Sequence, residues 1–382
     1  MSWPRVPLGE LLRVRTADII VDPTTAYQFA GVYSFGRGVF RGTERSGSTF
    51  AYRHLTRLRE GDFIYPKLMA WEGAFGIVPS SCSGCYVSPE FPVFEVNSGR
   101  LLSRFLGYYF QIPKIWESVS GGSTGTNVRR RRLYPEQLLR WRMPLPPLEE
   151  QRLIVARIDD LGRRTEQVRA LGEEITAETD AFLMSVYAQI AQSAPRRPMG
   201  EVAPLQRRPV SVDPESSYPQ VAVRSFGKGT FHREPLLGIE VTWQKPFLVK
   251  AGDILISNIK AWEGAIAVAL PHDDGRVGSH RYLTCVPVPG TATAQFVCFH
   301  LLTPTGLYDI GEASPGSADR NRTLSSTELL RIPIPVPSYR QQLWFDELVR
   351  KTGTVRRHRY EAAAELDAML PALLDHAFRG EL

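Results

Sequence analysis

The sequence is poor in cysteine and has no long apolar run. Four cysteines in 382 residues imply no disulfide framework, which favours a reducing, cytoplasmic setting. No stretch approaches the roughly 20 apolar residues that span a membrane, and the first five residues do not resemble a signal peptide, so we expect no membrane partner. With 43% hydrophobic and 23% charged residues, the composition is typical of folded proteins, and the length allows two or more domains.

Motifs of catalysis are also missing from the sequence. It has no Gly-x-x-x-x-Gly-Lys-Ser/Thr phosphate loop, no His-Glu-x-x-His, and no Asn/Asp-Pro-Pro-aromatic core of adenine methyltransferases. Gly121-x-Ser123-x-Gly125 formally matches a nucleophile elbow, but no apolar strand precedes it, so a loop is the better interpretation. We therefore favour a non-catalytic protein. A stand-alone nuclease or methyltransferase with degenerate motifs is the alternative.

What the sequence does contain is one unit present twice. The segment Val32-Tyr-Ser-Phe-Gly-Arg-Gly-Val-Phe40 recurs as Val223-Arg-Ser-Phe-Gly-Lys-Gly-Thr-Phe231. Ala-Trp-Glu-Gly-Ala at 70–74 recurs at 261–265. All such pairs are offset by 191 positions, half of the 382-residue chain, which indicates a tandem duplication.

A long helix is predicted at the end of the first copy. The prolines of Met143–Gln151 favour an extended approach, and Pro147 can occupy the first helical turn. An apolar row with a spacing of seven follows: Ile154, Leu161, Val168, Ile175 and Phe182. A weaker row lies four residues further on: Ile158, Thr165, Gly172, Thr179 and Val186. This predicts a helix of about 40 residues, roughly 60 Å long, whose narrow seam requires a partner helix.

The second copy supplies that partner. Pro333–Pro337 repeats the extended approach, and Ser338 with Gln341 fits a capping box before a helix that reaches Phe378. We expect the two helices to pair as an antiparallel coiled coil with a pseudo-twofold axis. The fold is then α+β, with two tandem mixed α/β domains that are each followed by a long helix. The expected boundaries are 1–145, 146–193, 194–337 and 338–382.

Short strands and helices are expected inside each block. Strand candidates are Phe63–Tyr65, Pro92–Val96 and Ile254–Ile256, and Gly-Asp turns at 61–62 and 252–253 precede two of them. Gly107–Trp116 and Thr293–Thr303 predict one short amphipathic helix per copy.

Metal and acid–base sites are not predicted. Cys82-x-x-Cys85 has no second Cys or His pair at usable spacing, and the second copy has Asp273 and Arg276 there, so we expect no metal. Glu72 and Glu263 occupy identical contexts without a partner in the sequence. We expect them to be buried structural carboxylates beside the neighbouring tryptophans.

Positive charge is concentrated outside the helices. Residues 149–191 carry nine acidic and five basic residues, a balance of −4, and residues 340–382 carry seven of each, a balance of zero. Because the whole chain has a net charge of +6, the remaining residues carry about +10. This favours a polyanion such as DNA. A scaffold whose basic blocks bind acidic proteins is the alternative.

The repeat separates two kinds of DNA contact. If both blocks bind DNA but read different bases, phosphate contacts should match between copies and base contacts should differ. Shared basic positions are candidate phosphate ligands: Arg37, Arg59, Arg129, Arg131, Lys228, Lys250, Arg320 and Arg322. Divergent polar positions are candidate base readers: Tyr33, Arg45, Lys67, Asn127, Arg130, Arg224, Asn258 and Asn321.

With these motifs the whole chain resembles the specificity subunit of type I restriction-modification systems. The most specific segments are Met143-Pro-Leu-Pro-Pro-Leu-Glu-Glu-Gln151 and Lys67-Leu-Met-Ala-Trp-Glu-Gly-Ala-Phe-Gly-Ile-Val-Pro79. The corresponding segment before the second long helix keeps only Pro335, Pro337 and Gln342 of the first of these motifs.

The resemblance implies a non-catalytic subunit with two target recognition domains. Each would read one half of an asymmetric bipartite site in double-stranded DNA, and the helix pair would set the spacer. Two methyltransferase subunits would dock on the helices, and an ATP-dependent restriction subunit would join them. S-adenosylmethionine, ATP and Mg²⁺ would then belong to the partners, and this chain would hold no cofactor.

Overall fold

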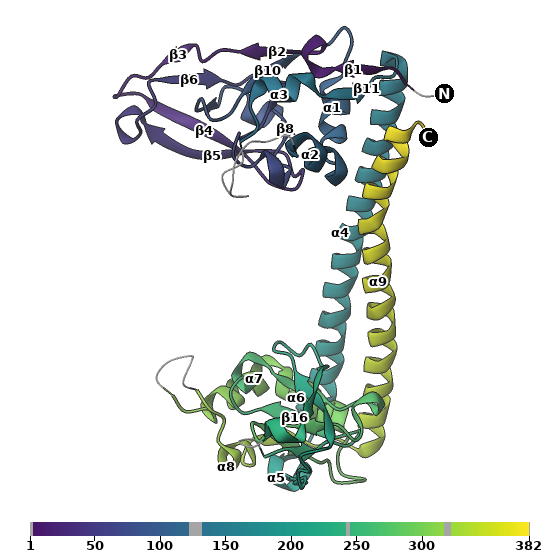
Figure 1. Cartoon of the computed structure of the whole chain (residues 1–382). Coiled ribbons are helices and arrows are strands. Elements are labelled where there is room, and N and C mark those ends of the chain that lie inside the picture. Colours follow the sequence, from purple (N-terminus) through teal and green to yellow (C-terminus); the bar gives the residue numbers. More distant parts are fainter. Residues whose placement is uncertain (1–2, 122–131, 242–244, 317–321, 382) are drawn as a thin grey trace. The chain divides into compact units, whose positions relative to one another are not determined.

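A computed structural model describes residues 3–121, 132–241, 245–316 and 322–381 (Figure 1). The chain forms two compact units. Unit 1 comprises Met1–Leu171 and Tyr360–Leu382, and unit 2 comprises Gly172–Arg359. Each unit therefore contains one of the two predicted target recognition domains (1–145 and 194–337), here called its recognition block, and one end of each long helix. Within the described residues no helix combines the length and the apolar character that crossing a membrane requires.

The recognition block of unit 1 is built on short sheets. One is five-stranded, in the order β3 (Ile19–Ile20), β6 (His54–Arg57), β9 (Tyr86–Val87), β4 (Ala26–Val32) and β5 (Val39–Ser46). Another is four-stranded, in the order β2 (Leu12–Arg15), β10 (Val93–Val96), β7 (Phe63–Ile64) and β8 (Gly76–Ile77). Strands β1 (Arg5–Pro7) and β11 (Arg142–Pro144) form an antiparallel pair that leads into the first long helix.

Helices cover these sheets and complete the core of unit 1. They are α1 (Ser103–Tyr109), α2 (Pro113–Ser120) and α3 (Pro135–Arg140), with 3-10 turns η1 (Leu8–Glu10), η2 (Gly47–Thr49), η3 (Ala70–Glu72) and η4 (Ser80–Cys82). The core is aromatic, because Phe63, Tyr65, Phe94 and Phe110 are almost entirely buried and their rings lie within contact distance of one another. Burial of rings this large contributes most of the apolar stabilisation of such a small block.

Unit 2 repeats this plan. Its sheets are β14 (Thr230–Leu237), β13 (Ser217–Val223), β18 (Val277–Gly278) and β15 (Phe247–Leu248); β17 (Ile266–Val268), β16 (Ile254–Ser257) and β19 (Tyr282–Cys285); and β12 (Arg196–Pro198) with β20 (Pro333–Pro335). Its helices and turns are α5 (Met199–Val202), α6 (Ala294–Leu302), α7 (Pro304–Glu312), α8 (Ser326–Leu329), η6 (Gly238–Val241), η7 (Ala261–Glu263) and η8 (Pro271–Asp273). Hairpin β13–β14 has the bounds of β4–β5 shifted by 191, and in both copies a third strand joins the first strand in parallel.

The predicted strands and turns are confirmed: Phe63–Tyr65 and Pro92–Val96 contain β7 and β10, and Ile254–Ile256 lies within β16. The predicted helix Thr293–Thr303 is confirmed as α6 with its two capping threonines. The predicted helix Gly107–Trp116 is wrong, because it spans the end of α1 and the start of α2, and in both copies a second short helix follows the first. Pro113 and Pro304 separate them, because proline begins a helix well but disfavours a helical residue before it.

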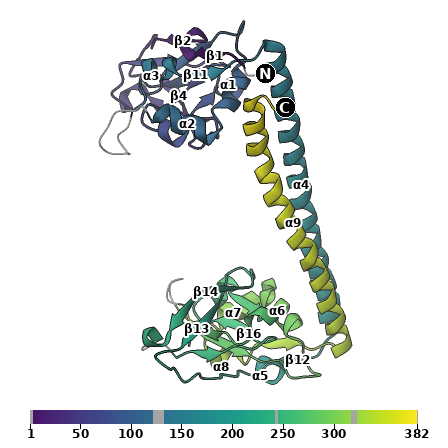
Figure 2. The ribbon, with the colours of Figure 1, turned by 45° about the vertical axis from the view of Figure 1, so that its right-hand side comes forward.

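The long helices are α4 (Leu148–Gln192) and α9 (Tyr339–Arg379) (Figure 2). Both predicted extended approaches are confirmed as strands β11 and β20. Pro147 lies just before the first turn rather than inside it, and its carbonyl accepts the amide of Gln151. The capping box of α9 is confirmed, since Gln341 Oε1 accepts the backbone amide of Ser338 at 3.1 Å and Ser338 Oγ accepts that of Gln341 at 3.4 Å.

Two equivalent glutamines hold these helices to their blocks. Gln151 is fully buried; its Oε1 accepts the amide of Leu102 at 2.8 Å, and its Nε2 donates to the carbonyls of Arg100 and Pro146, both at 2.9 Å. In unit 2, Gln342 makes the same three bonds. The shared glutamine of the repeat therefore fixes where each long helix begins relative to its block.

Within each unit the two long helices pair antiparallel. In unit 1 the start of α4 (Ile154, Ile158) shares a core with the end of α9 (Leu374, Ala377). In unit 2 the end of α4 packs against the start of α9, where Tyr187 contacts Phe345. Ion pairs also join the helices, Arg169 with Asp367 in unit 1 and Arg356 with Asp180 in unit 2.

The stronger of the two rows predicted for α4 is wrong over most of its length. Ile154 is buried, but Val168, Ile175 and Phe182 are 49%, 43% and 52% exposed. A straight helix turns every 3.6 residues, so a row spaced by seven drifts around it by about 20° per repeat and leaves the partner. The weaker predicted row lies on the less exposed face, with Ile158 buried and Thr165, Gly172, Thr179 and Val186 partly buried. Gly162 and Thr176 lie on the same face.

Candidate nucleic-acid interface

The two repeated motifs contact each other in both units. In unit 1 the loop that follows β4 lies on η3, where the amides of Phe35 and Gly36 donate to the carbonyls of Glu72 and Gly73 at 2.7 and 2.9 Å. In unit 2 the amide of Phe226 donates to the carbonyl of Glu263 at 2.8 Å. Each recognition hairpin is thus anchored at its tip by backbone bonds that do not depend on the side chains it presents.

The two glutamates complete this anchor. Glu72 Oε2 accepts Ser34 Oγ at 2.9 Å, and Glu263 Oε2 accepts Ser225 Oγ at 3.0 Å. A hydrogen bond from Lys260 lowers the pKa of Glu263. The glutamates are structural, as predicted, but they are half-exposed rather than buried because each caps a surface loop.

At the tip of each hairpin a phenylalanine adopts a left-handed backbone. Phe35 and Phe226 both have φ of 62° and are 64% and 73% exposed. A left-handed backbone conformation costs a residue with a Cβ roughly 1–2 kcal/mol. Because both rings are exposed, apolar burial does not offset this cost. Our sequence interpretation missed both residues. Both copies have phenylalanine at this position, and this repetition was the signal that could have identified the two residues. The sequence did not show that they are exposed.

Predicted DNA contacts gather at these tips. In unit 1 the ring of Tyr33 stacks on Phe40 with centroids 4.1 Å apart, and the guanidinium of Arg37 lies 5.3 Å from the Tyr33 ring. Tyr33 and Arg37 belong to the β4–β5 turn and Phe40 to the start of β5, so one predicted base reader and one predicted phosphate ligand lie side by side. Arg45 is exposed as well, but it lies opposite Tyr27, at the other end of the hairpin.

The same turn in unit 2 presents different chemistry. Arg224 lies 4.8 Å over the ring of Phe231 and donates to the carbonyl of Thr230 at 2.8 Å. Lys228 is exposed, with Nζ 5.9 Å from the ring of Phe226. The two turns therefore have the same backbone conformation and an equivalent basic residue, Arg37 or Lys228, while Tyr33 in one is replaced by Arg224 in the other.

Two further predicted phosphate ligands occupy the Gly-Asp turns. Arg59 and Lys250 are exposed, and their amides donate to Asp62 and Asp253, both at 2.8 Å. Each aspartate also pairs with a neighbouring arginine, Arg15 at 2.5 Å in unit 1 and Arg208 at 2.7 Å in unit 2. The aspartates hold the turns, and the two basic side chains extend from the surface.

Lys67 and Asn258 are tied into the protein. Lys67 Nζ donates to the carbonyl of Pro89 at 2.8 Å. Asn258 is half-buried, and its backbone bonds to Arg281 and Leu324. As base readers, both would have to leave these positions or act through the groups beside them.

A cationic cluster surrounds Trp262 in unit 2. Arg322 lies 5.8 Å and Lys260 5.3 Å from the indole ring. Lys260 replaces Met69 of the first copy, a divergence that our sequence interpretation did not use. The other predicted contacts lie outside the described residues: Asn127, Arg129, Arg130, Arg131, Arg320 and Asn321. All of the predicted contacts remain predictions.

The comparisons with known proteins identify the domain in the first half of the chain. Residues 2–177 match the family model described as the type I restriction modification DNA specificity domain. The chain carries a type I restriction-modification specificity domain. This match covers the first recognition block and most of α4, and the repeat at an offset of 191 extends the same plan to the second half. No functionally curated protein matches the sequence.

Solved structures share the fold over the whole chain. The HsdS subunit from Thermoanaerobacter tengcongensis has a TM-score of 0.58 at 22% identity, covering 100% of this chain and 97% of that one. A structure described as "Structural basis underlying complex assembly and conformational transition of the type I R-M system" has a TM-score of 0.69 at 21% identity, covering 100% and 98%. The S subunit from M. genitalium has a TM-score of 0.50 at 13% identity, covering 98% and 96%.

The predicted family is thereby confirmed for residues 2–177, whose family model describes a DNA specificity domain of type I restriction modification. This description favours DNA recognition over a stand-alone enzyme or a scaffold for acidic proteins. The solved structures confirm the predicted fold over the whole chain, with two tandem α/β blocks and paired long helices.

Proposed function

We propose that each recognition block reads one half of an asymmetric, bipartite DNA site. The observation that carries this proposal is the matched pair of hairpin tips. Their anchoring bonds and their cations, Arg37 and Lys228, are common to both units, whereas Tyr33 and Arg224 differ. A shared cation suits the phosphate backbone, which is the same in every sequence, and a divergent side chain suits base edges, which are not.

The long helices set the spacer and dock methyltransferase subunits. They expose large apolar side chains, Val168 and Leu171 in unit 1 and Ile175 and Phe182 in unit 2. Exposed apolar surface of this kind is typical of sites that bind another protein. Each unit also has a cavity against its helix pair, of about 500 Å³ in unit 1 and 540 Å³ in unit 2. Half of the residues that line the unit 1 cavity have their counterpart in the lining of the unit 2 cavity, including Gly162 and Gly353, which suits two copies of one partner.

The chain itself contributes no catalytic group to this complex. S-adenosylmethionine, ATP and Mg²⁺ belong to the methyltransferase and restriction subunits, and the assembly works on DNA in the cytoplasm. The absence of catalytic motifs from the sequence supports this division of labour.

Methylome sequencing tests the proposal directly. A host carrying this chain and its methyltransferase should show one adenine-methylation motif in two unequal halves separated by a fixed gap. Deletion of the chain should abolish that motif while the methyltransferase is still expressed. Methylation that persists without the chain, or a motif without a gap, contradicts the proposal.

The shared cations give a second prediction. Arg37→Ala and Lys228→Ala should each weaken DNA binding at every sequence and reduce the slope of log K against log salt by about one, because each removes one phosphate contact. Fluorescence anisotropy over a salt series measures the slope. Glu166→Ala, an exposed change on α4, is the control. A changed sequence preference in either variant would contradict the phosphate assignment.

A further inference from the structure

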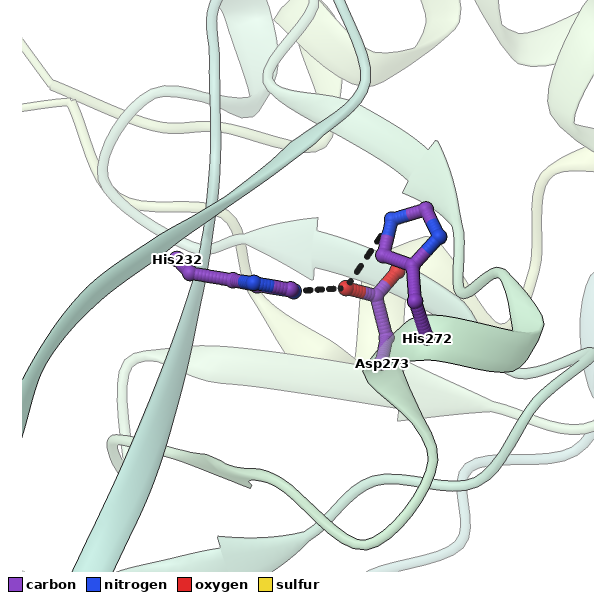
Figure 3. Close-up of side chains that lie close together, drawn as sticks. All are labelled: His232, His272 and Asp273. Atoms are coloured by element: carbon purple, nitrogen blue, oxygen red, sulfur yellow. Dashed lines mark hydrogen bonds and ion pairs between the residues drawn. The ribbon is translucent and has the colours of Figure 1, made fainter.

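Unit 2 brings His232 close to two consecutive residues that lie far from it in the sequence, His272 and Asp273. His232 lies on β14, and His272 and Asp273 belong to η8, forty residues further along the chain (Figure 3). One nitrogen of each imidazole and one carboxylate oxygen all lie within 4.8 Å of one another. We propose that these three residues bind a divalent transition-metal ion, with Zn²⁺ as the best chemical match.

The donor set fits such an ion. Two imidazoles and one carboxylate form a ligand set of borderline softness that zinc accepts at about 2.0–2.2 Å per bond, leaving a fourth position for water. Ligand atoms in a tetrahedron of that size are about 3.3 Å apart. In unit 2 the carboxylate Oδ1 lies 2.9 Å from His232 Nε2 and 3.8 Å from His272 Nε2, on either side of that value.

The aspartate is already held in place by the protein. Asp273 is fully buried, and its Oδ2 accepts the hydroxyl of Thr230 and the amide of Leu270, both at 2.9 Å. Outer contacts of this kind orient a metal ligand, and here they leave Oδ1 facing the two histidines.

The histidines can complete the geometry at little cost. The side chain of His272 is 59% exposed and that of His232 is 35% exposed, so both rings can turn without repacking the core. Only a small rotation is required, since the two ring centroids are 5.4 Å apart. An ion at this point would join β14 to η8 and so restrain the hairpin that carries Arg224 and Lys228.

The first copy provides an internal comparison. Positions equivalent to His232, His272 and Asp273 are Arg41, Ser81 and Cys82, which form no such ligand set. Cys82 and Cys85 are buried free thiols. The site therefore belongs to the second recognition block, and the expected stoichiometry is one ion per chain.

Metal analysis of the full-length, untagged chain tests this proposal. After removal of metal with a chelator, dialysis against Zn²⁺ should leave about one zinc per chain by atomic emission, and Co²⁺ should give the visible absorption of a tetrahedral site. His272→Ala is the decisive variant because it removes an exposed side chain and should leave the fold intact. It should weaken zinc binding by at least about 100-fold, more than loss of an outer contact does.

Three further variants sharpen the result. His232→Ala should lose zinc as His272→Ala does, while His280→Ala, eight residues further along, and Cys82→Ala should keep it. Circular dichroism confirms that each variant is folded. No zinc bound by the wild-type chain, zinc retained in both ligand variants, or zinc lost on Cys82→Ala would each overturn the assignment.

Discussion

At the scale of single residues, two buried glutamines join helix to block. Gln151 and Gln342 each satisfy one amide and two carbonyls that would otherwise be buried without partners. An unsatisfied buried polar group costs about 1–3 kcal/mol, so these side chains contribute more than their apolar stems. The sequence revealed that the glutamine is repeated, but not why.

Gln151→Leu should therefore destabilise unit 1 by about 2 kcal/mol or more, because it leaves the Leu102 amide and two carbonyls unpaired. Urea denaturation measures the loss, and hydrogen exchange should place it around residues 100–155. Gln167→Leu, an exposed change on the same helix, should be nearly neutral. Equal effects of the two substitutions would show that the hydrogen bonds do not matter.

Asp346 on α9 gives a prediction about pH. Its burial raises the pKa to about 6, although a hydrogen bond from Thr293 opposes the shift. A carboxyl whose pKa is higher in the folded state contributes stability that is full below its unfolded pKa of about 4. That stability is lost as the pH rises through about 6.

Asp346→Asn should therefore stabilise the chain at pH 8 and have little effect at pH 4. The expected difference is roughly 1–2 kcal/mol, since partial solvent contact reduces the full value. Unfolding free energies at the two pH values measure it. Glu365→Gln, an exposed change on the same helix, serves as the control. A variant less stable than wild type at pH 8 would contradict the assignment.

At the scale of helices, substitution of two glycines of unit 2 by alanine should change the stability in opposite directions. A Cβ on Gly353 in α9 would meet nothing within 4 Å, whereas one on Gly306 in α7 would lie 2.1 Å from the carbonyl oxygen of His300. Gly353→Ala should stabilise by about 0.5–1 kcal/mol through helix propensity, and Gly306→Ala should destabilise by about 1–3 kcal/mol through overpacking. Thermal denaturation of the two variants compares the signs directly.

The sequence predicted the long helices well and their contacts poorly. Proline placement, the capping box and the repeat are local or periodic signals, so they located α4 and α9 to within a few residues. The facing residues depend on how a straight helix lies against its partner, which a row spaced by seven does not specify. The partner of Thr176 illustrates this, since it is Arg359, a residue that no apolar pattern would select.

The candidate interface shows a similar division. Comparison of the copies selected side chains that the structure brings together at the hairpin tips, because the anchoring motif is repeated there and nearby side chains diverge. Their contacts with DNA stay predictions. The comparison did not reveal that Lys67 donates to Pro89, or that His232 faces Asp273, because both contacts join segments that are distant in the sequence.

At the scale of the whole molecule, the proposed spacer role predicts how an insertion acts. One extra helical turn in α4 should lengthen the DNA gap by one to two base pairs, because a turn rises about 5.4 Å and a base pair about 3.4 Å. Both half-sites should stay the same. Methylome sequencing detects the new gap, and four residues inserted at the Gly290 turn should leave it unchanged. An altered half-site would contradict the division between readers and spacer.

Unit 1 is formed by the two ends of the chain, and this has a consequence for biosynthesis. Phe378 packs against Phe105 and Tyr109, and Leu374 and Ala377 are buried in the same core, although more than 250 positions separate α1 from this end of α9. A nascent chain therefore emerges from the ribosome with the apolar surface of its first block uncovered until the second block has been translated. A stop codon anywhere before residue 370 would leave the first block without the helix that covers it, although its own sequence is intact.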